Sequence, residues 1–330
     1  MRRFAWFSAI SAALTFPLIG FGAIVRLKGA GLACPDWPLC YGKVTPLGEV
    51  VTPAPAGLGI ALEVGHRYVA GILGLMVLGL CVVAWGWLRE RRAATFWSTV
   101  ALVVLIPQVV LGGLTVLMKL APWTVSLHLL FGNLLWASLL ALAIRSFQES
   151  NGRPAPVKPS AWPAVTSWVV AAWGLTFVQI FMGGLVSSSG AGVACPDFPL
   201  CDGGALVPAG AGTPVWLQLA HRGVGFALAA TFVGAAVTAF RSRRASGGVK
   251  LGLGLAVGLV VLQILIGWYN VAHHVPVPTS ALHTGMAATI VGVMTWTAVQ
   301  AMSLGRETVS VAADQPTSSE DGSWPLPETV

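Results

Sequence analysis

Residues 62–68 read Leu-Glu-Val-Gly-His-Arg-Tyr, and the chain repeats this stretch in altered form at 217–223 as Leu-Gln-Leu-Ala-His-Arg-Gly. Each copy begins a long apolar run, and each is followed by a second isolated histidine. The histidine spacing is the same in both copies, since 128 − 66 and 283 − 221 both equal 62. Two histidine pairs at one spacing predict a chain built from two related halves.

The repeat extends over nearly the whole chain. Residues 29–40, Gly-Ala-Gly-Leu-Ala-Cys-Pro-Asp-Trp-Pro-Leu-Cys, recur at 190–201 as Gly-Ala-Gly-Val-Ala-Cys-Pro-Asp-Phe-Pro-Leu-Cys, an offset of 161. From the histidine stretch onward the offset is 155, because the second copy lacks six residues after its cysteines. Gln108 and Gly112 thus match Gln263 and Gly267. Each half contains four apolar runs, an even number, so both halves should have the same orientation.

Composition indicates a membrane protein. Of 330 residues, 55% are hydrophobic and only 9% are charged, and runs of about 20 apolar residues match the thickness of a bilayer. We expect an all-α polytopic membrane protein whose eight transmembrane helices form two tandem four-helix bundles, related by a pseudo-twofold axis along the membrane normal. The eight expected spans are about 4–25, 62–88, 97–118, 123–144, 162–187, 215–240, 250–271 and 279–304.

Four segments follow from this division. Residues 1–146 are the first four-helix half, and 161–305 are the second. A polar, proline-containing linker is expected at 147–160 on the cytoplasmic side. Residues 306–330 are rich in Ser, Thr, Pro and acidic residues, and they predict a disordered cytoplasmic tail.

The basic residues predict the topology. With a cytoplasmic N-terminus, thirteen Lys and Arg residues fall in inside segments and four in outside loops, which follows the positive-inside rule and places both termini in the cytoplasm. The net charge of +7 is therefore a topology signal, and nucleic-acid binding is excluded. The inside residues are Arg2, Arg3, Arg89, Arg91, Arg92, Arg145, Arg153, Lys158, Arg241, Arg243, Arg244, Lys250 and Arg306, and the outside ones are Arg26, Lys28, Lys43 and Lys119.

Four of the five cysteines fall in the outside loops, as Cys34 with Cys40 and Cys195 with Cys201. Thiols that face an oxidising compartment usually pair, and no histidine stands at metal-ligand spacing from them. A disulfide in each half is favoured over a metal site, and a redox role for either pair stays open. Cys81 lies alone in an apolar run and is expected to fill the core.

The four isolated histidines should lie at one depth, in the outer leaflet. Polar residues inside a bilayer are costly and usually mark function. Two imidazoles facing each other across parallel helices suit the axial positions of haem iron, whereas Cu or Zn would need further ligands. Arg67 and Arg222 follow two of the histidines, near the interface where haem propionates would emerge; the alternative is that they are interfacial side chains that reach toward water.

Glu63 distinguishes the halves. It precedes His66 by three residues, on the same helix face, and Gln218 stands at the matching position of the second half. Glutamine keeps the shape and hydrogen bonding of glutamate but carries no charge. Chemistry is therefore assigned to the first half and electron relay to the second. The alternative is that Glu63 is only an ion-pair partner of Arg67.

Taken together, these motifs resemble the heme A synthase family over about residues 4–304. The most specific parts are Glu-Val-Gly-His-Arg at 63–67 and the cysteine stretch at 34–40. The family oxidises the C8 methyl of haem O to a formyl group, which gives haem A for cytochrome c oxidase. The resemblance therefore implies a haem-dependent membrane oxidoreductase in a prokaryotic plasma membrane.

The resemblance also implies residue roles and partners. His66 and His128 would be axial ligands of the substrate haem O or product haem A, and His221 and His283 would be those of a haem b cofactor. Glu63 would be the catalytic carboxylate. Cys34 and Cys40 would form a pair needed for activity, and Cys195 and Cys201 a structural disulfide. The implied partners are the lipid bilayer and haem O, which comes from haem O synthase. Transient contacts with that enzyme and with cytochrome c oxidase are expected, and the protein could form a homo-oligomer.

Two other functions fit the histidines. A di-haem electron-transfer cytochrome working with quinol would use Glu63 only to tune a haem. A haem chaperone or exporter without redox chemistry would leave the Glu63/Gln218 difference without a purpose. The synthase and the cytochrome differ in their product, because only the synthase modifies haem O.

Overall fold

A computed structural model describes residues 1–53, 55–152 and 164–302. In this part of the chain, eight helices are long and apolar enough to cross a membrane, and there is no β-strand. The all-helical, multi-pass membrane fold is therefore confirmed. The eight long helices are α1 (Arg2–Leu27), α3 (Ala56–Trp87), α4 (Arg92–Leu117), α5 (Pro122–Ser150), α6 (Ala164–Ser188), α7 (Thr213–Arg241), α8 (Gly247–Ala272) and α9 (Val277–Ala301).

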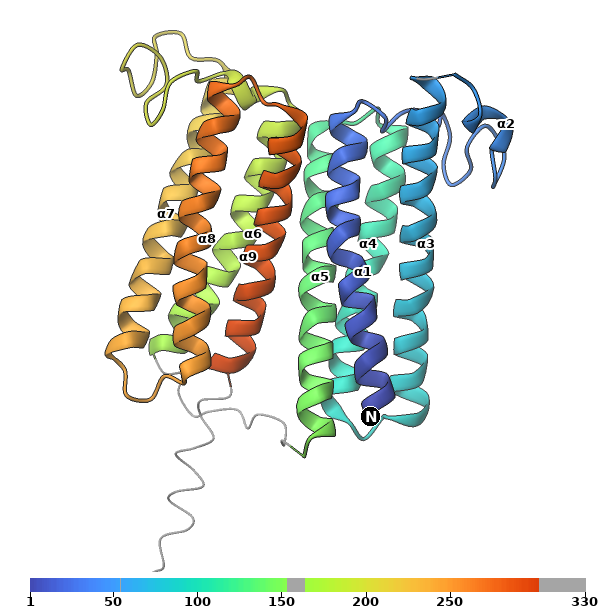
Figure 1. Cartoon of the computed structure of the whole chain (residues 1–330), viewed down its shortest axis with the longest axis vertical. Coiled ribbons are helices and arrows are strands. Elements are labelled where there is room, and N and C mark those ends of the chain that lie inside the picture. Colours follow the sequence, from blue (N-terminus) through green and yellow to red (C-terminus); the bar gives the residue numbers. More distant parts are fainter. Residues whose placement is uncertain (54, 153–163, 303–330) are drawn as a thin grey trace, which may run out of the picture.

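The long helices stand side by side in two groups of four (Figure 1). In the first group the packed neighbours are α1 with α3, α3 with α4, α4 with α5, and α5 with α1, so α3 and α5 are diagonal partners. The second group has the same order, α6, α7, α8 and α9, so α7 and α9 are diagonal. This order matters because the four isolated histidines lie on the diagonal helices.

The groups meet where α1 and α5 pack against α9 and where α5 packs against α6. A Cβ atom added to Gly184 would lie 2.9 Å from the Cα of Ser126, so α5 and α6 approach closely through small residues. The indole N–H of Trp136 donates a 3.1 Å hydrogen bond to the carbonyl oxygen of Ala288. Close backbone approach and a partly buried side-chain hydrogen bond thus join the halves.

Two cysteine loops lie at the same end of the molecule (Figure 1). The first cysteine loop (residues 28–53) connects α1 to α3 and includes the short helix α2 (Leu47–Val50); the second (residues 189–212) connects α6 to α7 and includes the 3-10 turn η1 (Ala191–Val193). The N-terminus lies at the opposite end.

Each helix group has a buried core of apolar side chains toward the end away from its cysteine loop. The buried cluster of the first group includes Leu73, Val77 and Leu142. That of the second includes Phe232 and Met294. The isolated histidines lie nearer the loops than most of these side chains, and Phe21, which packs against the first cluster, contacts the His66 ring edge-on.

Some predicted boundaries were wrong. Helix α3 begins at Ala56, not at 62, because the chain can turn into a helix directly after Pro55. Helix α5 continues to Ser150, into the predicted linker 147–160, because Phe147 packs edge-on against Trp6 across the group. Residues 153–160 of the linker and the tail 306–330 lie outside the described residues.

Candidate functional site

Each isolated histidine projects from one helix of a diagonal pair. His66 is on α3 and His128 on α5, and the two rings are near enough to interact electrostatically. His221 on α7 and His283 on α9 interact in the same way. All four side chains are partly exposed, although they belong to apolar helices. The structure therefore brings together both pairs that the spacing predicted.

A glycine on a neighbouring helix makes room for each ring. A Cβ atom added to any of these four ring-contact glycines would lie closer to the histidine Cε1 than nine in ten real Cβ contacts. The pairs are Gly22 with His66 (3.0 Å), Gly112 with His128 (3.1 Å), Gly183 with His221 (3.0 Å) and Gly267 with His283 (3.2 Å). The absence of four side chains thus fixes where the imidazoles lie.

Two glutamines also touch the rings. The Nε2 atom of Gln108 lies 3.4 Å from Nε2 of His128, and the Nδ1 atom of His128 lies 3.1 Å from the Gln108 carbonyl oxygen. In the second half, Gln179 lies 3.5 Å from Nε2 of His221. Position 18, which matches Gln179 in the repeat, is leucine. His66 therefore lacks the amide neighbour that its counterpart has.

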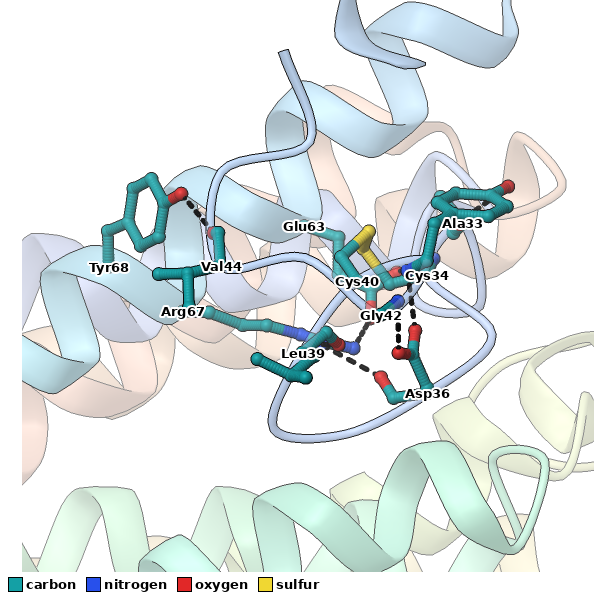
Figure 2. The surroundings of a disulfide bond; sticks show 11 residues. Ala33, Cys34, Asp36, Leu39, Cys40, Gly42, Val44, Glu63, Arg67 and Tyr68 are labelled. Carbon is teal, nitrogen blue, oxygen red and sulfur yellow. Dashed lines mark hydrogen bonds and ion pairs between the residues drawn. A yellow bond between two sulfur atoms is a disulfide. The ribbon is translucent and has the colours of Figure 1, made fainter. Parts of the chain in front are cut away.

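Glu63 is buried, with only 4% of its surface exposed, and both carboxylate oxygens are engaged (Figure 2). One oxygen accepts a 2.8 Å hydrogen bond from the backbone N–H of Cys34, and the other forms a 2.5 Å ion pair with Arg67. The ion pair of the alternative interpretation is thus present. The bond to Cys34 was not anticipated, and it ties the carboxylate to the first cysteine loop.

Gln218 repeats half of this arrangement. Its Oε1 atom accepts a 2.5 Å hydrogen bond from the N–H of Cys195, and its Nε2 donates a 2.9 Å bond to the carbonyl oxygen of Gly192. The loop attachment is therefore the same in both halves. What differs is the charge, which only Glu63 carries.

The two arginines hold the loops. Arg67 donates to the carbonyl oxygens of Asp36 and Leu39, at 2.9 and 2.6 Å. Arg222 likewise donates to Asp197 and Leu200, at 2.8 and 2.6 Å. Both were predicted to meet haem propionates; in the structure each guanidinium binds its own loop, and a propionate contact stays a prediction.

Both cysteine loops contain a disulfide, Cys34–Cys40 and Cys195–Cys201, while Cys81 is a buried free thiol (Figure 2 shows the first disulfide). Inside the first loop, hydrogen bonds from the backbone N–H groups of Gly42 and Tyr41 lower the pKa of Asp36 below its usual value. The loop is therefore held by a disulfide, an aspartate turn and the Glu63–Arg67 pair.

Comparison with known proteins identifies the family. Residues 5–295 match the family described as cytochrome oxidase assembly protein. The chain is 32% identical to the heme A synthase of Shewanella oneidensis, over 87% of this chain and 93% of that protein. It is 30% identical to the heme A synthase of Shouchella clausii, over 74% and 79%, and 27% identical to that of Geobacillus kaustophilus, over 94% and 95%.

The chain belongs to the heme A synthase family. The histidine sites fit the haem that this membership implies. Two imidazoles on diagonal helices suit a metal whose other ligands come from a planar macrocycle. The Nδ1 atoms of His66, His221 and His283 are buried without a hydrogen-bond partner among the described residues.

For this heme A synthase family member, the histidine spacing did not identify every residue of the site. Gly22 and Gly183 were missed, although the offset of 161 aligns them and would have found them. Gln179 has no partner in the repeat, so no pattern indicated it. The hydrogen bond from Cys34 to Glu63 joins residues 29 positions apart, and no sequence periodicity signals such a contact.

Proposed function

We propose that this protein oxidises the C8 methyl of haem O to a formyl group and so supplies haem A for cytochrome c oxidase. Membership of the heme A synthase family supports this reaction. The observation that carries it is a buried carboxylate beside only one of two otherwise matched histidine pairs. A protein that only relays electrons has no evident need for that difference.

The two halves have separate tasks in this proposal. His66 and His128 hold the substrate haem O in the first half (1–146), and His221 and His283 hold haem b in the second (161–305). When bound there, haem b would supply one-electron redox chemistry. The packing of α5 against α6 and α9 supports this division, because it brings the two groups into direct contact.

Glu63 supplies a fixed negative charge close to the substrate pair. It stands one helical turn before His66, and its two oxygens accept hydrogen bonds from Arg67 and from Cys34. These contacts orient the carboxylate and suit its charged form. A carboxylate held in this way can stabilise positive charge on the substrate or take up a proton as the methyl group is oxidised.

The placement in the cell is part of the proposal. The charge distribution of the sequence supports cytoplasmic termini in a prokaryotic plasma membrane, with the histidine sites and cysteine loops toward the outer face. Haem O arrives from haem O synthase, so transient contacts with that enzyme and with cytochrome c oxidase are proposed as well, and a homo-oligomer is compatible with them.

The test is the haem composition of membranes from a host that makes haem O but has no heme A synthase of its own. Expression of this chain should produce haem A on reverse-phase separation, with hydroxylated haem O as a minor species. A matched His66→Ala variant should produce none while still binding haem B. If the folded wild-type protein leaves haem O unchanged, the proposal is wrong and the di-haem cytochrome is supported instead.

A further inference from the structure

Two consecutive glycines of α4 contact the site from different directions. Gly112 touches the His128 ring, and Gly113 lies buried beneath the indole of Trp37 from the first cysteine loop. A Cβ atom added to Gly113 would lie 2.9 Å from Cδ2 of Trp37, so only glycine lets the indole lie there. Because α3 also holds this loop through Glu63, the loop extends from α3 to α4 at the histidine end of the first half.

The second half lacks this contact. Trp268 stands at the position of Gly113, and Phe198 at the position of Trp37. Phe198 packs back on α7, with its ring centroid 6.1 Å from that of Phe226 and 5.6 Å from the guanidinium carbon of Arg222. The second loop aromatic therefore packs against the helix that already holds the loop.

The two loops share several attachments, whereas the packing of the loop aromatic differs between them. Both loops hydrogen-bond to position 63 or 218, both are bound by an arginine, and both contact the following helix hairpin. The hairpin contacts are Gly31 with Leu120 and Gly192 with Val275, and a Cβ atom added to either glycine would lie 3.3 Å from the nearest side-chain carbon.

We propose that Trp37 is a substrate-positioning residue that covers the first half and retains haem O until its oxidation is complete. This inference rests on the proposed function. A substrate must stay bound through successive oxidation steps and then leave, whereas a permanent haem b needs no removable cover. Trp37 suits such a cover because it is held on Gly113 by packing and is 37% exposed, so it can leave α4 without breaking the disulfide.

The experiment compares Trp37→Ala and Gly113→Trp with the matched control Phe198→Ala. Each purified protein, loaded with haem B and haem O or A, is incubated in detergent with excess apomyoglobin as a haem acceptor. The haems that remain are extracted and separated over time. Both first-half variants should lose haem O and haem A about tenfold faster than the parent, which corresponds to a barrier to haem release that is about 1.4 kcal/mol lower. They should retain haem B as the parent does.

The phenylalanine control should leave the retention of haem O and haem A unchanged. Parental retention in both first-half variants would overturn the inference, and so would an equal effect of Phe198→Ala on the first half. Loss of haem B together with haem O would also overturn it, because the effect would then be general unfolding. Failure of the parent to make haem A would instead refute the proposed function, so the two failures are distinguishable.

Discussion

Replacing Glu63 by glutamine removes its negative charge and installs the side chain that the second half already has at the matching position, Gln218. In the second half, Gln218 accepts the N–H of Cys195 and donates to Gly192. In the first half Glu63 already accepts the N–H of Cys34, and Gly31 is the repeat counterpart of Gly192. Glu63→Gln should therefore keep the loop attached while it removes the negative charge beside His66.

The cost to stability follows from the contacts. Glu63→Ala leaves the Cys34 N–H and the buried side of Arg67 without a partner, and losing one member of a buried ion pair costs about 3–5 kcal/mol. Glu63→Gln preserves one of these hydrogen bonds, and Arg67 keeps its bonds to the loop carbonyls. Its cost should therefore be about 1–2 kcal/mol. If the charge acts in catalysis, haem A formation should fall at least about 100-fold in both variants.

The assay separates folding from chemistry. Thermal unfolding in detergent should rank the wild-type protein above Glu63→Gln and that variant above Glu63→Ala. Extracted haem should show that Glu63→Gln still binds haem O and haem B. Normal haem A production by a haem-loaded Glu63→Gln protein would refute the catalytic role, and Glu63 would then only attach the loop.

Three further predictions concern other parts of the site. Gly183→Leu should displace the His221 ring and deplete haem B while the first half keeps its haem, as measured by the haem ratio in the purified protein. Hydrogen bonding lowers the pKa of Asp36 from 3.8, so its stabilisation is complete above that value and is lost only as the pH falls through the lower folded pKa. Hydrogen exchange at the Gly42 amide should therefore stay protected in mild acid, and Asp36→Ala, which removes the acceptor, should make this exchange faster than in the parent at the same pH. Reduction of the first disulfide should destabilise the protein by about 2 kcal/mol, seen as a lower melting temperature in reducing buffer, and an unchanged melting temperature would contradict this estimate.

Much of the fold could be predicted because a bilayer requires long apolar helices, and the sequence contains eight of them. The start of α3 was harder, because Ala56–Ala61 is rich in glycine and alanine and follows two prolines, which resembles a loop. The extension of α5 depends on Phe147 meeting Trp6, a contact between residues far apart in the sequence. Local patterns do not encode such contacts.

The histidine pairs could be predicted for a different reason. An internal repeat acts as a comparison of the chain with itself, so residues with a function in both halves appear twice. Glu63 was found as a difference between the copies, and the contact of Trp37 with Gly113 is another such difference. Its meaning emerges only when the structure shows that the two residues touch.

The shared loop attachment of Glu63 and Gln218 has a consequence for how such a protein could arise. If both halves descend from one ancestral four-helix unit, a single exchange between glutamate and glutamine could separate a reactive site from a passive one. Because either side chain accepts the cysteine N–H, that exchange need not pass through an unfolded intermediate. The hydrogen bond to the loop would thus have left this position free to diverge after duplication, while the architecture around it stayed the same.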